Sequence, residues 1–143
     1  MAANMYPNVS NLNFRELQRV TDDVRSIIGW YRQHSSLATR LDCYTCGGEM
    51  IEDADNKRAD GVCWRCCEHN CRKEVLIRTG SFFGDVTSLE LVKIVDLLYY
   101  YLYEQASVKT LIRELQITSE TIVNWQSFMH LLHICGGTTK KMP

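Results

Sequence analysis

The sequence predicts a small α+β protein that is mostly helical, with an N-terminal helix, a small zinc ribbon built on a β-hairpin, and a helical unit that contains a helix-turn-helix. Two observations predict this fold class. Apolar residues recur every three or four positions in the first and last parts of the chain, which is typical of amphipathic helices. Six of the seven cysteines lie between positions 43 and 71, in a region without that periodicity, which indicates a metal-stabilised segment of short strands.

The length and the charge exclude several classes of protein. The 143 residues are 45% hydrophobic, which is enough for one domain with its own core. With 16 Lys and Arg against 17 Asp and Glu, the formal net charge is −1. This balance excludes a broad polycationic surface, so a protein of this kind that binds nucleic acid needs a local basic patch. The sequence has no run of about 18 apolar residues, so we expect no membrane span.

The first 38 residues divide into a leader and a helix. Residues 1–12 are polar and rich in asparagine, and we expect a flexible leader there. Residues 13–38 are predicted to form the N-terminal helix, capped by Asn13, with Glu16 at the position of a capping-box carboxylate. Its buried face is predicted to carry Phe14, Leu17, Val20, Val24, Ile27, Ile28 and Tyr31.

The cysteines of residues 39–84 indicate a metal site. No secretory signal precedes them, and thiols inside a cell stay reduced, so a tight cluster favours metal binding over disulfides. Cys43 and Cys46 have C-x-x-C spacing, so the turn between them can aim both sulfurs at one ion. Gly47 and Gly48 follow and give that turn its backbone freedom. The sequence therefore predicts one structural Zn²⁺.

The second pair of zinc ligands is less clearly marked. We favour Cys66 and Cys71, because Cys66 follows a predicted strand at Val62–Arg65 and Cys71 precedes another at Lys73–Arg78. Residues 52–61 are predicted to form a flexible loop. Cys63 is then expected to be a small buried residue. Cys63, Cys67 and His69 remain as alternative ligands.

Two other interpretations of the cysteines stay open at this point. They are a set of buried free thiols, and a redox-active C-x-x-C pair. The redox interpretation lacks the βαβ context that a thioredoxin-like site has. Four thiolates leave no open coordination position, so the predicted ion folds the ribbon and activates no water.

Residues 85–137 are predicted to form the helical unit. Thr87 is the expected cap of a long helix at Leu89–Gln105, with Glu90 three residues later. This helix is apolar around most of its circumference. We therefore expect Leu89–Leu102 either to be packed on all sides or to form a homodimer interface.

The last part of the chain is predicted to form a helix-turn-helix. Ser107 caps a short helix at Val108–Leu115, and Thr118 or Ser119 caps a final helix that ends near Cys135, before Gly136 and Gly137. Residues 138–143 are expected to be a mobile tail. The buried stripe of the final helix is predicted to contain Ile122, Trp125, Phe128 or Met129, Leu132 and Cys135.

The opposite face of the final helix carries short polar side chains, which suit base edges in a major groove. Asn124 can pair with adenine through two hydrogen bonds. The alternative is that this is the ordinary solvated face of a helix bundle. The candidate base-reading residues are Ser119, Thr121, Asn124 and Ser127, and the candidate phosphate-binding residues are Arg65, Arg72, Lys73, Arg78 and Lys109.

The sequence resembles the N-terminal region of Merlin-type DDE transposases and of related bacterial insertion-sequence transposases. The resemblance covers residues 14–135, and its most specific parts are Trp64-Arg65-Cys66, Cys71-Arg72-Lys73 and the stretch Ile77–Phe83. It implies a zinc ribbon followed by a helix-turn-helix that recognises transposon ends in double-stranded DNA. It also implies that the zinc ligands are Cys43, Cys46, Cys66 and Cys71, and that the protein is nuclear, or in the cytosol or nucleoid of a prokaryote.

One feature of that family is not matched. Its catalytic RNase-H-like domain is expected to begin just after Cys135, and this sequence ends eight residues later. We therefore expect no enzyme but a DNA-binding fragment or domesticated remnant. The main alternative is a zinc-stabilised adaptor for protein interaction or dimerisation, favoured by the near-neutral charge and the apolar Leu89–Leu102 helix. A third possibility is a subunit that acts with a separate catalytic chain.

Overall fold

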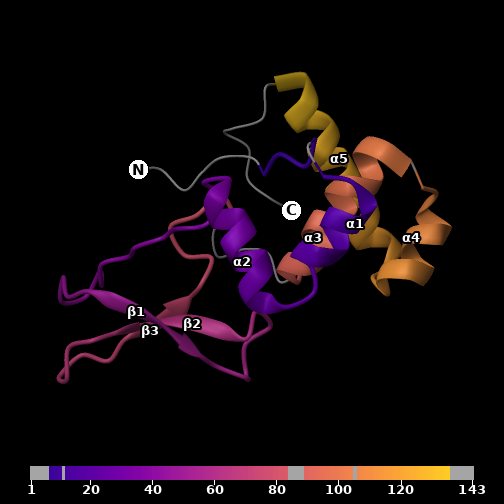
Figure 1. The fold of residues 1–143 in the computed structure, drawn as a ribbon. Coiled ribbons are helices and arrows are strands. Elements are labelled where there is room, and N and C mark those ends of the chain that lie inside the picture. The colour runs from indigo at the N-terminus through magenta and orange to yellow at the C-terminus, as the bar shows by residue number, and fades with distance from the viewer. Residues whose placement is uncertain (1–6, 11, 84–88, 105, 136–143) are drawn as a thin grey trace.

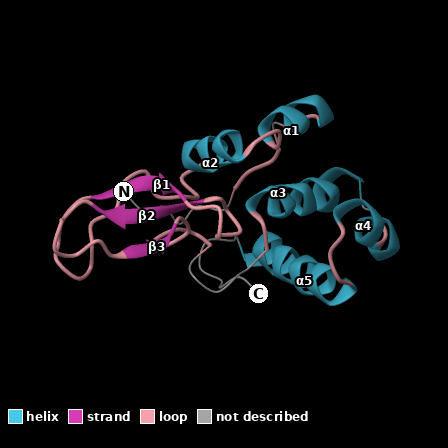
Figure 2. Ribbon diagram, turned by 90° about the horizontal axis from the view of Figure 1, so that it is seen from below, coloured by secondary structure: helices cyan, strands magenta, loops and turns pink. Residues whose placement is uncertain are grey.

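The computed structural model describes residues 7–10, 12–83, 89–104 and 106–135, and within these ranges it leaves out the side chains of residue 104 and residues 132–135. Its composition of helices and a small antiparallel sheet confirms the mixed α and β fold class. Figures 1 and 2 show the sheet at one end, the last helices at the other, and α2 between them. The elements are α1 (Phe14–Val20), α2 (Val24–Gln33), β1 (Met50–Ala54), β2 (Val62–Cys66), β3 (Glu74–Leu76), α3 (Leu91–Tyr99), the π-helix η1 (Tyr100–Glu104), α4 (Val108–Leu115) and α5 (Ser119–Cys135).

The N-terminal helix predicted at residues 13–38 is two helices. Asn13 caps α1 as expected, because its side chain accepts a hydrogen bond from the backbone N–H of Glu16. Thr21 ends α1 and bonds back to the Leu17 carbonyl at 2.8 Å, and Asp23 then caps α2. The single-helix prediction is wrong because a second capping residue restarts the chain three positions after the first helix ends.

Part of the expected leader is anchored to the helical unit. Val9 is fully buried. The Tyr103 hydroxyl donates a hydrogen bond of 2.6 Å to the Ser10 carbonyl. The prediction of a flexible leader is therefore wrong at residues 9 and 10, because a buried valine and a tyrosine hydroxyl hold them in place. Residues 1–6 and 11 lie outside the described part of the chain.

The sheet has the antiparallel order β1-β2-β3, with Met50 opposite Cys66 and Cys63 opposite Leu76. Strand β1 occupies part of the stretch that the sequence predicted as a flexible loop. Its acidic residues are paired, because Arg32 of α2 lies 2.7 Å from Glu52 and Arg65 of β2 pairs with Asp53. Charges that look like a solvated loop in the sequence are thus neutralised by arginines of α2 and of the neighbouring strand β2.

The long apolar helix is a core element. Leu91, Ile94, Val95, Leu97, Leu98 and Tyr99 of α3 are buried, and α3 contacts α2, α4 and α5. The sequence left open whether this helix is packed on all sides or forms a homodimer interface. The packing of α3 within one chain accounts for its apolar residues. The predicted cap Thr87 lies outside the described residues, as do Gly136, Gly137 and the tail at 138–143.

Two buried polar contacts tie the sheet region to the helices. Arg78 pairs with Asp60 through bonds of 2.8 and 2.7 Å, and its guanidinium also donates to the Leu89 carbonyl just before α3. The Tyr31 hydroxyl of α2 donates to the Leu91 carbonyl at 2.6 Å. Because buried polar groups are costly to leave without partners, these contacts fix how the two parts meet.

Candidate metal centre and nucleic-acid interface

The structure brings four cysteine sulfurs together at one end of the sheet. The Sγ atoms of Cys43, Cys46, Cys66 and Cys71 all lie within 4.8 Å of one another. Cys43 and Cys71 are 3.7 Å apart, and Cys46 and Cys66 are 3.4 Å apart. In a tetrahedron with Zn–S bonds of about 2.3 Å, the sulfurs are about 3.8 Å apart, so the cluster has the size of a four-thiolate metal site. These four residues can therefore hold a metal ion.

Two turns of the chain shape the cluster. In the first turn, the Cys43 N–H bonds to the Gly48 carbonyl at 2.7 Å, and the Gly47 N–H bonds to the Cys43 carbonyl at 2.8 Å. In the second, the Cys66 N–H bonds to the Lys73 carbonyl at 2.8 Å, which closes the loop that contains Cys71. Each pair of sulfurs is thus positioned by backbone hydrogen bonds within its own turn.

The Cys46 sulfur accepts a hydrogen bond of 3.4 Å from the backbone N–H of Gly48. At the other sulfurs, backbone N–H groups act to lower the thiol pKa, those of Cys46 and Thr45 at Cys43, that of Glu68 at Cys66 and that of Lys73 at Cys71. A hydrogen bond of this kind stabilises a thiolate more than a thiol. The backbone around the cluster therefore favours the thiolate form, although burial and the neighbouring cysteines raise the pKa of Cys66 and Cys71.

The two turns touch at Gly48. A Cβ at that position would lie 2.6 Å from Cγ of Glu68 and 3.3 Å from the Cys46 sulfur. Gly47 has φ +74°, a left-handed conformation that residues with a side chain rarely adopt. The Gly47-Gly48 pair therefore permits both the sharp turn and the close approach of the second cysteine turn.

In the absence of an ion, the pKa values of the cluster thiols differ from one another. Backbone N–H groups, first that of Cys46, lower the pKa of Cys43 to about 6. The Glu68 N–H lowers the pKa of Cys66, but burial and the neighbouring cysteines outweigh it and raise that pKa to about 12. One thiolate is thus favoured at the expense of its neighbours, and a bound cation would allow all four sulfurs to lose their protons.

The remaining described cysteines lie outside the cluster. Cys63 is fully buried on β2, and burial raises the pKa of its thiol. Cys67 is exposed, with its N–H bonded to the Glu49 carbonyl. The side chain of His69 lies 3.4 Å from Arg72 and is also outside the cluster. The structure therefore groups the favoured cysteines and leaves out the three alternatives.

The predicted phosphate-binding residues have unequal access to solvent. Arg72, Lys73 and Lys109 are exposed. Arg65 is held between Asp53 and Glu74, so a phosphate would compete with two carboxylates. Arg78 is 2% exposed and is paired with Asp60, so its prediction as a phosphate contact is wrong. The sequence could not indicate this, because Asp60 is remote along the chain and reaches Arg78 only after folding.

The predicted base-reading residues lie on the solvent side of α5. Ser119, Asn124 and Ser127 are exposed and Thr121 is half-buried, whereas Ile122, Trp125, Phe128 and Met129 are buried. The side chains of Leu132 and Cys135 lie outside the described residues. Ser107 caps α4, and Thr118 accepts the Thr121 N–H at the start of α5, as expected. Gln116, in a left-handed conformation at φ 55°, makes the sharp turn between these helices.

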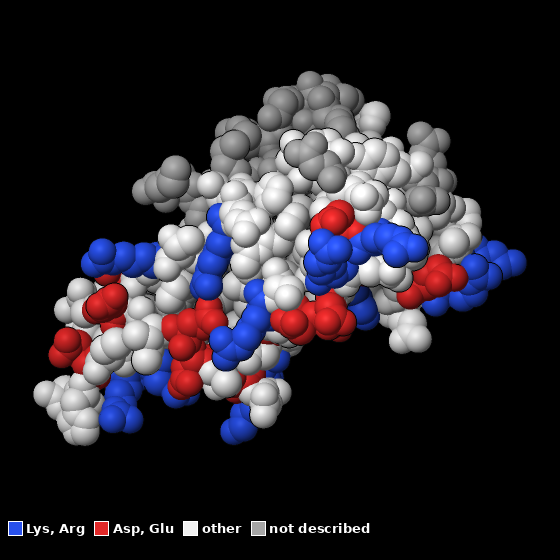
Figure 3. Space-filling model, viewed as in Figure 1, with Lys and Arg blue, Asp and Glu red and all other residues white. Residues whose placement is uncertain are grey.

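The surface carries charges of both signs. Figure 3 shows basic and acidic side chains interspersed over this face of the molecule, without a large patch of one sign. Among the described residues, no helix is both long enough and apolar enough to span a membrane. A nucleic-acid interface on this protein would therefore depend on a few placed cations rather than on net charge.

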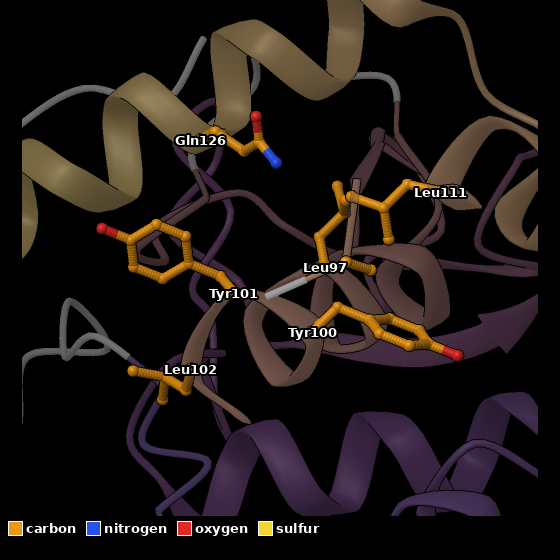
Figure 4. Close-up of a pocket in the computed structure, with 7 residues that line it drawn as sticks. Leu97, Tyr100, Tyr101, Leu102, Leu111 and Gln126 are labelled. Carbon is orange, nitrogen blue, oxygen red and sulfur yellow. The ribbon is translucent and has the colours of Figure 1, made fainter. Parts of the chain in front are cut away.

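A cavity of about 500 Å³ opens where η1 meets α4 and α5. Figure 4 shows Gln126 pointing from α5 toward a wall formed by Leu97, Tyr100 and Tyr101. Leu102, Ala106 and Leu111 complete the lining. The cavity is lined mainly by apolar side chains and lies apart from the cysteine cluster.

Comparisons of the chain with models of protein families, with curated proteins and with solved structures give no match. The resemblance to Merlin-type transposases therefore depends on the motif residues named above.

Proposed function

We propose that the protein is a zinc-dependent DNA-binding module. In this proposal Cys43, Cys46, Cys66 and Cys71 hold one structural Zn²⁺. All-sulfur tetrahedral sites favour zinc or iron, and zinc suits a structural role because it has no redox chemistry. The spacing of the four sulfurs and the Gly48 N–H bond to the Cys46 sulfur support thiolate ligation. The ion would keep the two cysteine turns together and so hold the exposed Arg72 and Lys73 in place.

The DNA-reading element of the proposal is a helix-turn-helix made of α4 and α5. The observation that carries it is the exposed polar row Ser119, Asn124 and Ser127 on a helix whose other side is buried. Short polar side chains near the start of such a helix fit the major groove, with Asn124 suited to adenine. Lys109 on α4 supplies an exposed cation for phosphate.

The mechanism is recognition without bond chemistry, as the resemblance implies for the end-binding region of a transposase. We propose that the protein recognises DNA in this way in the nucleus or the equivalent prokaryotic compartment. Zinc has only a folding role in this proposal, because four thiolates leave it no open position.

A titration with a random pool of duplex DNA at two salt concentrations tests the proposal. We expect nanomolar to micromolar binding that weakens steeply with salt, because phosphate contacts release counterions. After selection of a preferred sequence, Asn124→Ala should relax the preference at one base position by roughly 1–3 kcal/mol. Lys109→Ala should weaken all sequences alike. Absence of binding at low salt would refute the proposal.

An adaptor for protein interaction is the second candidate, and exposed apolar residues favour it. Val123 is 49% exposed in the middle of the polar row of α5, and Ile112 on α4 is 39% exposed. Apolar side chains at these positions suit a protein partner or a second copy of the chain. If DNA does not bind, Val123→Asp should abolish self-association or partner binding, which size-exclusion chromatography with light scattering can measure for the homodimer.

A further inference from the structure

An exposed aromatic ring stands on the first cysteine turn. Tyr44 follows Cys43 directly and is 71% exposed, more than any other large hydrophobic residue in the described part of the chain. The backbone beneath it is held by the two hydrogen bonds between Cys43 and the Gly47-Gly48 pair. The ring is therefore presented to solvent on a constrained turn and not on a loose loop. An aromatic side chain placed in this way is suited to stacking.

A cation is fixed beside this ring. The Lys73 ammonium lies 5.5 Å from the centre of the Tyr44 ring, in a cation–π contact. Lys73 comes from the second cysteine turn, so the ring and the charge are held together by the two turns that carry the sulfurs. Arg72 adds a second exposed cation next to Lys73.

A hollow of about 620 Å³ with a mixed polar and apolar lining opens between the two cysteine turns, beside Lys73. Its lining includes Thr45, Glu68, Asn70 and Lys73, which carry a hydroxyl, a carboxylate, an amide and an ammonium group, together with Cys46 and Cys71 of the cluster. Such groups can donate to and accept from the Watson–Crick edge of a nucleobase. That edge is available only in an unpaired base, because pairing occupies it in a duplex.

We propose that Tyr44, Lys73 and the adjoining hollow form a binding site for an unpaired nucleobase of DNA. The base stacks on Tyr44, its edge enters the hollow between Thr45 and Asn70, and Lys73 pairs with a neighbouring phosphate. This inference rests on the proposed DNA-binding function and adds a substrate class to it, namely DNA with a single-stranded stretch at a duplex end or fork. The site is separate from the polar row of α5.

Fluorescence anisotropy with the full metal-loaded chain tests the inference. The two probes are one duplex with blunt ends and the same duplex with an extension of about five unpaired nucleotides. We expect the extended duplex to bind roughly tenfold more tightly, which is the range of one base–aromatic stacking contact. Tyr44→Ala should remove this gain, and Tyr44→Trp should keep it because tryptophan preserves a stacking face.

The matched control is Ile51→Ala, which removes another exposed apolar side chain, 50% exposed, from the same sheet region. It should leave the gain unchanged, and the metal content of each variant shows whether the cysteine turns are intact. Equal binding of both duplexes, or a gain that survives Tyr44→Ala, overturns the inference while leaving the proposed duplex recognition in place. Binding of the extended probe without binding of the blunt one supports the inference and overturns duplex recognition, and binding of neither overturns both.

Discussion

At the scale of single residues, two neighbouring cysteines have opposite environments. Cys66 is the last residue of β2 and is buried, with its sulfur 3.4 Å from that of Cys46. Cys67 is exposed, outside the cluster. Successive side chains of an extended segment point in opposite directions, so only one of the two can face the ion. This pair therefore provides a matched test of the ligand set.

Cys66→Ser should lose the metal, and Cys67→Ser should keep it. If the whole site contributes about 10–16 kcal/mol of apparent binding free energy, one ligand is worth roughly 3 kcal/mol, or on the order of a hundredfold in affinity. Elemental analysis of the purified chains should give about one zinc per chain for the native protein and for Cys67→Ser. Retention of stoichiometric metal by Cys66→Ser would contradict the assignment of Cys66 as a ligand. Iron in place of zinc would contradict the proposed identity of the metal.

The cysteines were predictable because ligand geometry is local. A C-x-x-C turn followed by two glycines, and a cysteine at a strand end, can be recognised from a few neighbouring residues. The environment of Arg78 was not predictable in this way. Its sequence neighbours suggest a basic hairpin, but its partner Asp60 comes from another turn and its third contact is the Leu89 carbonyl. An arginine's role depends on which distant carboxylate folding brings to it.

At the scale of elements, α3 carries a carboxyl in an apolar setting. Asp96 lies between Val95 and Leu97, which are both buried, and burial raises the pKa of Asp96 to about 6. The folded state therefore holds this proton more tightly than the unfolded chain, where the usual value is 3.8. The contribution of the Asp96 carboxyl to the free energy of unfolding is therefore most favourable below pH 4, and it is lost as the pH rises through about 6.

Asp96→Asn should therefore stabilise the protein at pH 7.5, on the order of 2 kcal/mol, because it removes a charge that burial disfavours. The gain in melting temperature should shrink as the pH is lowered toward 5, where the native carboxyl takes up its proton. The control is Asp22→Asn, which removes a negative charge from an exposed position. A pH-independent gain for Asp96→Asn would contradict the assigned environment.

Elements were predictable where capping residues and apolar spacing agree, as for α4 between Ser107 and Gln116. Strand β1 and the break between α1 and α2 were not predicted. Strand β1 was missed because Glu52 and Asp53 look like loop residues until their arginine partners are in place. The break between α1 and α2 was missed because the apolar spacing continues through it, although Val24 is exposed. Periodicity reports which side is apolar and does not show where a helix is interrupted.

At the scale of the whole molecule, the sheet region and the helical unit have different sources of stability. The helical unit has its own apolar core, in which α3, α4 and α5 bury Ile94, Leu111 and Trp125. The sheet is three short strands with the cysteine cluster at one end, and such a small sheet depends on added constraints. The Arg78 and Tyr31 contacts with the Leu89 and Leu91 carbonyls join the two.

Removal of the metal should therefore unfold the molecule in part. Hydrogen exchange measured with and without a zinc chelator should show full loss of protection in β1, β2 and β3, because the metal-free sulfurs no longer hold the two turns together. Protection in α4 and α5 should persist, because their core contains no ligand. The first turn of α3, which bonds Ile94 N–H to the Glu90 carbonyl, should show an intermediate loss, since it receives the Arg78 and Tyr31 contacts. Equal loss in every helix would show instead that the metal supports one cooperative unit, and unchanged protection in the strands would show that the sheet folds without metal.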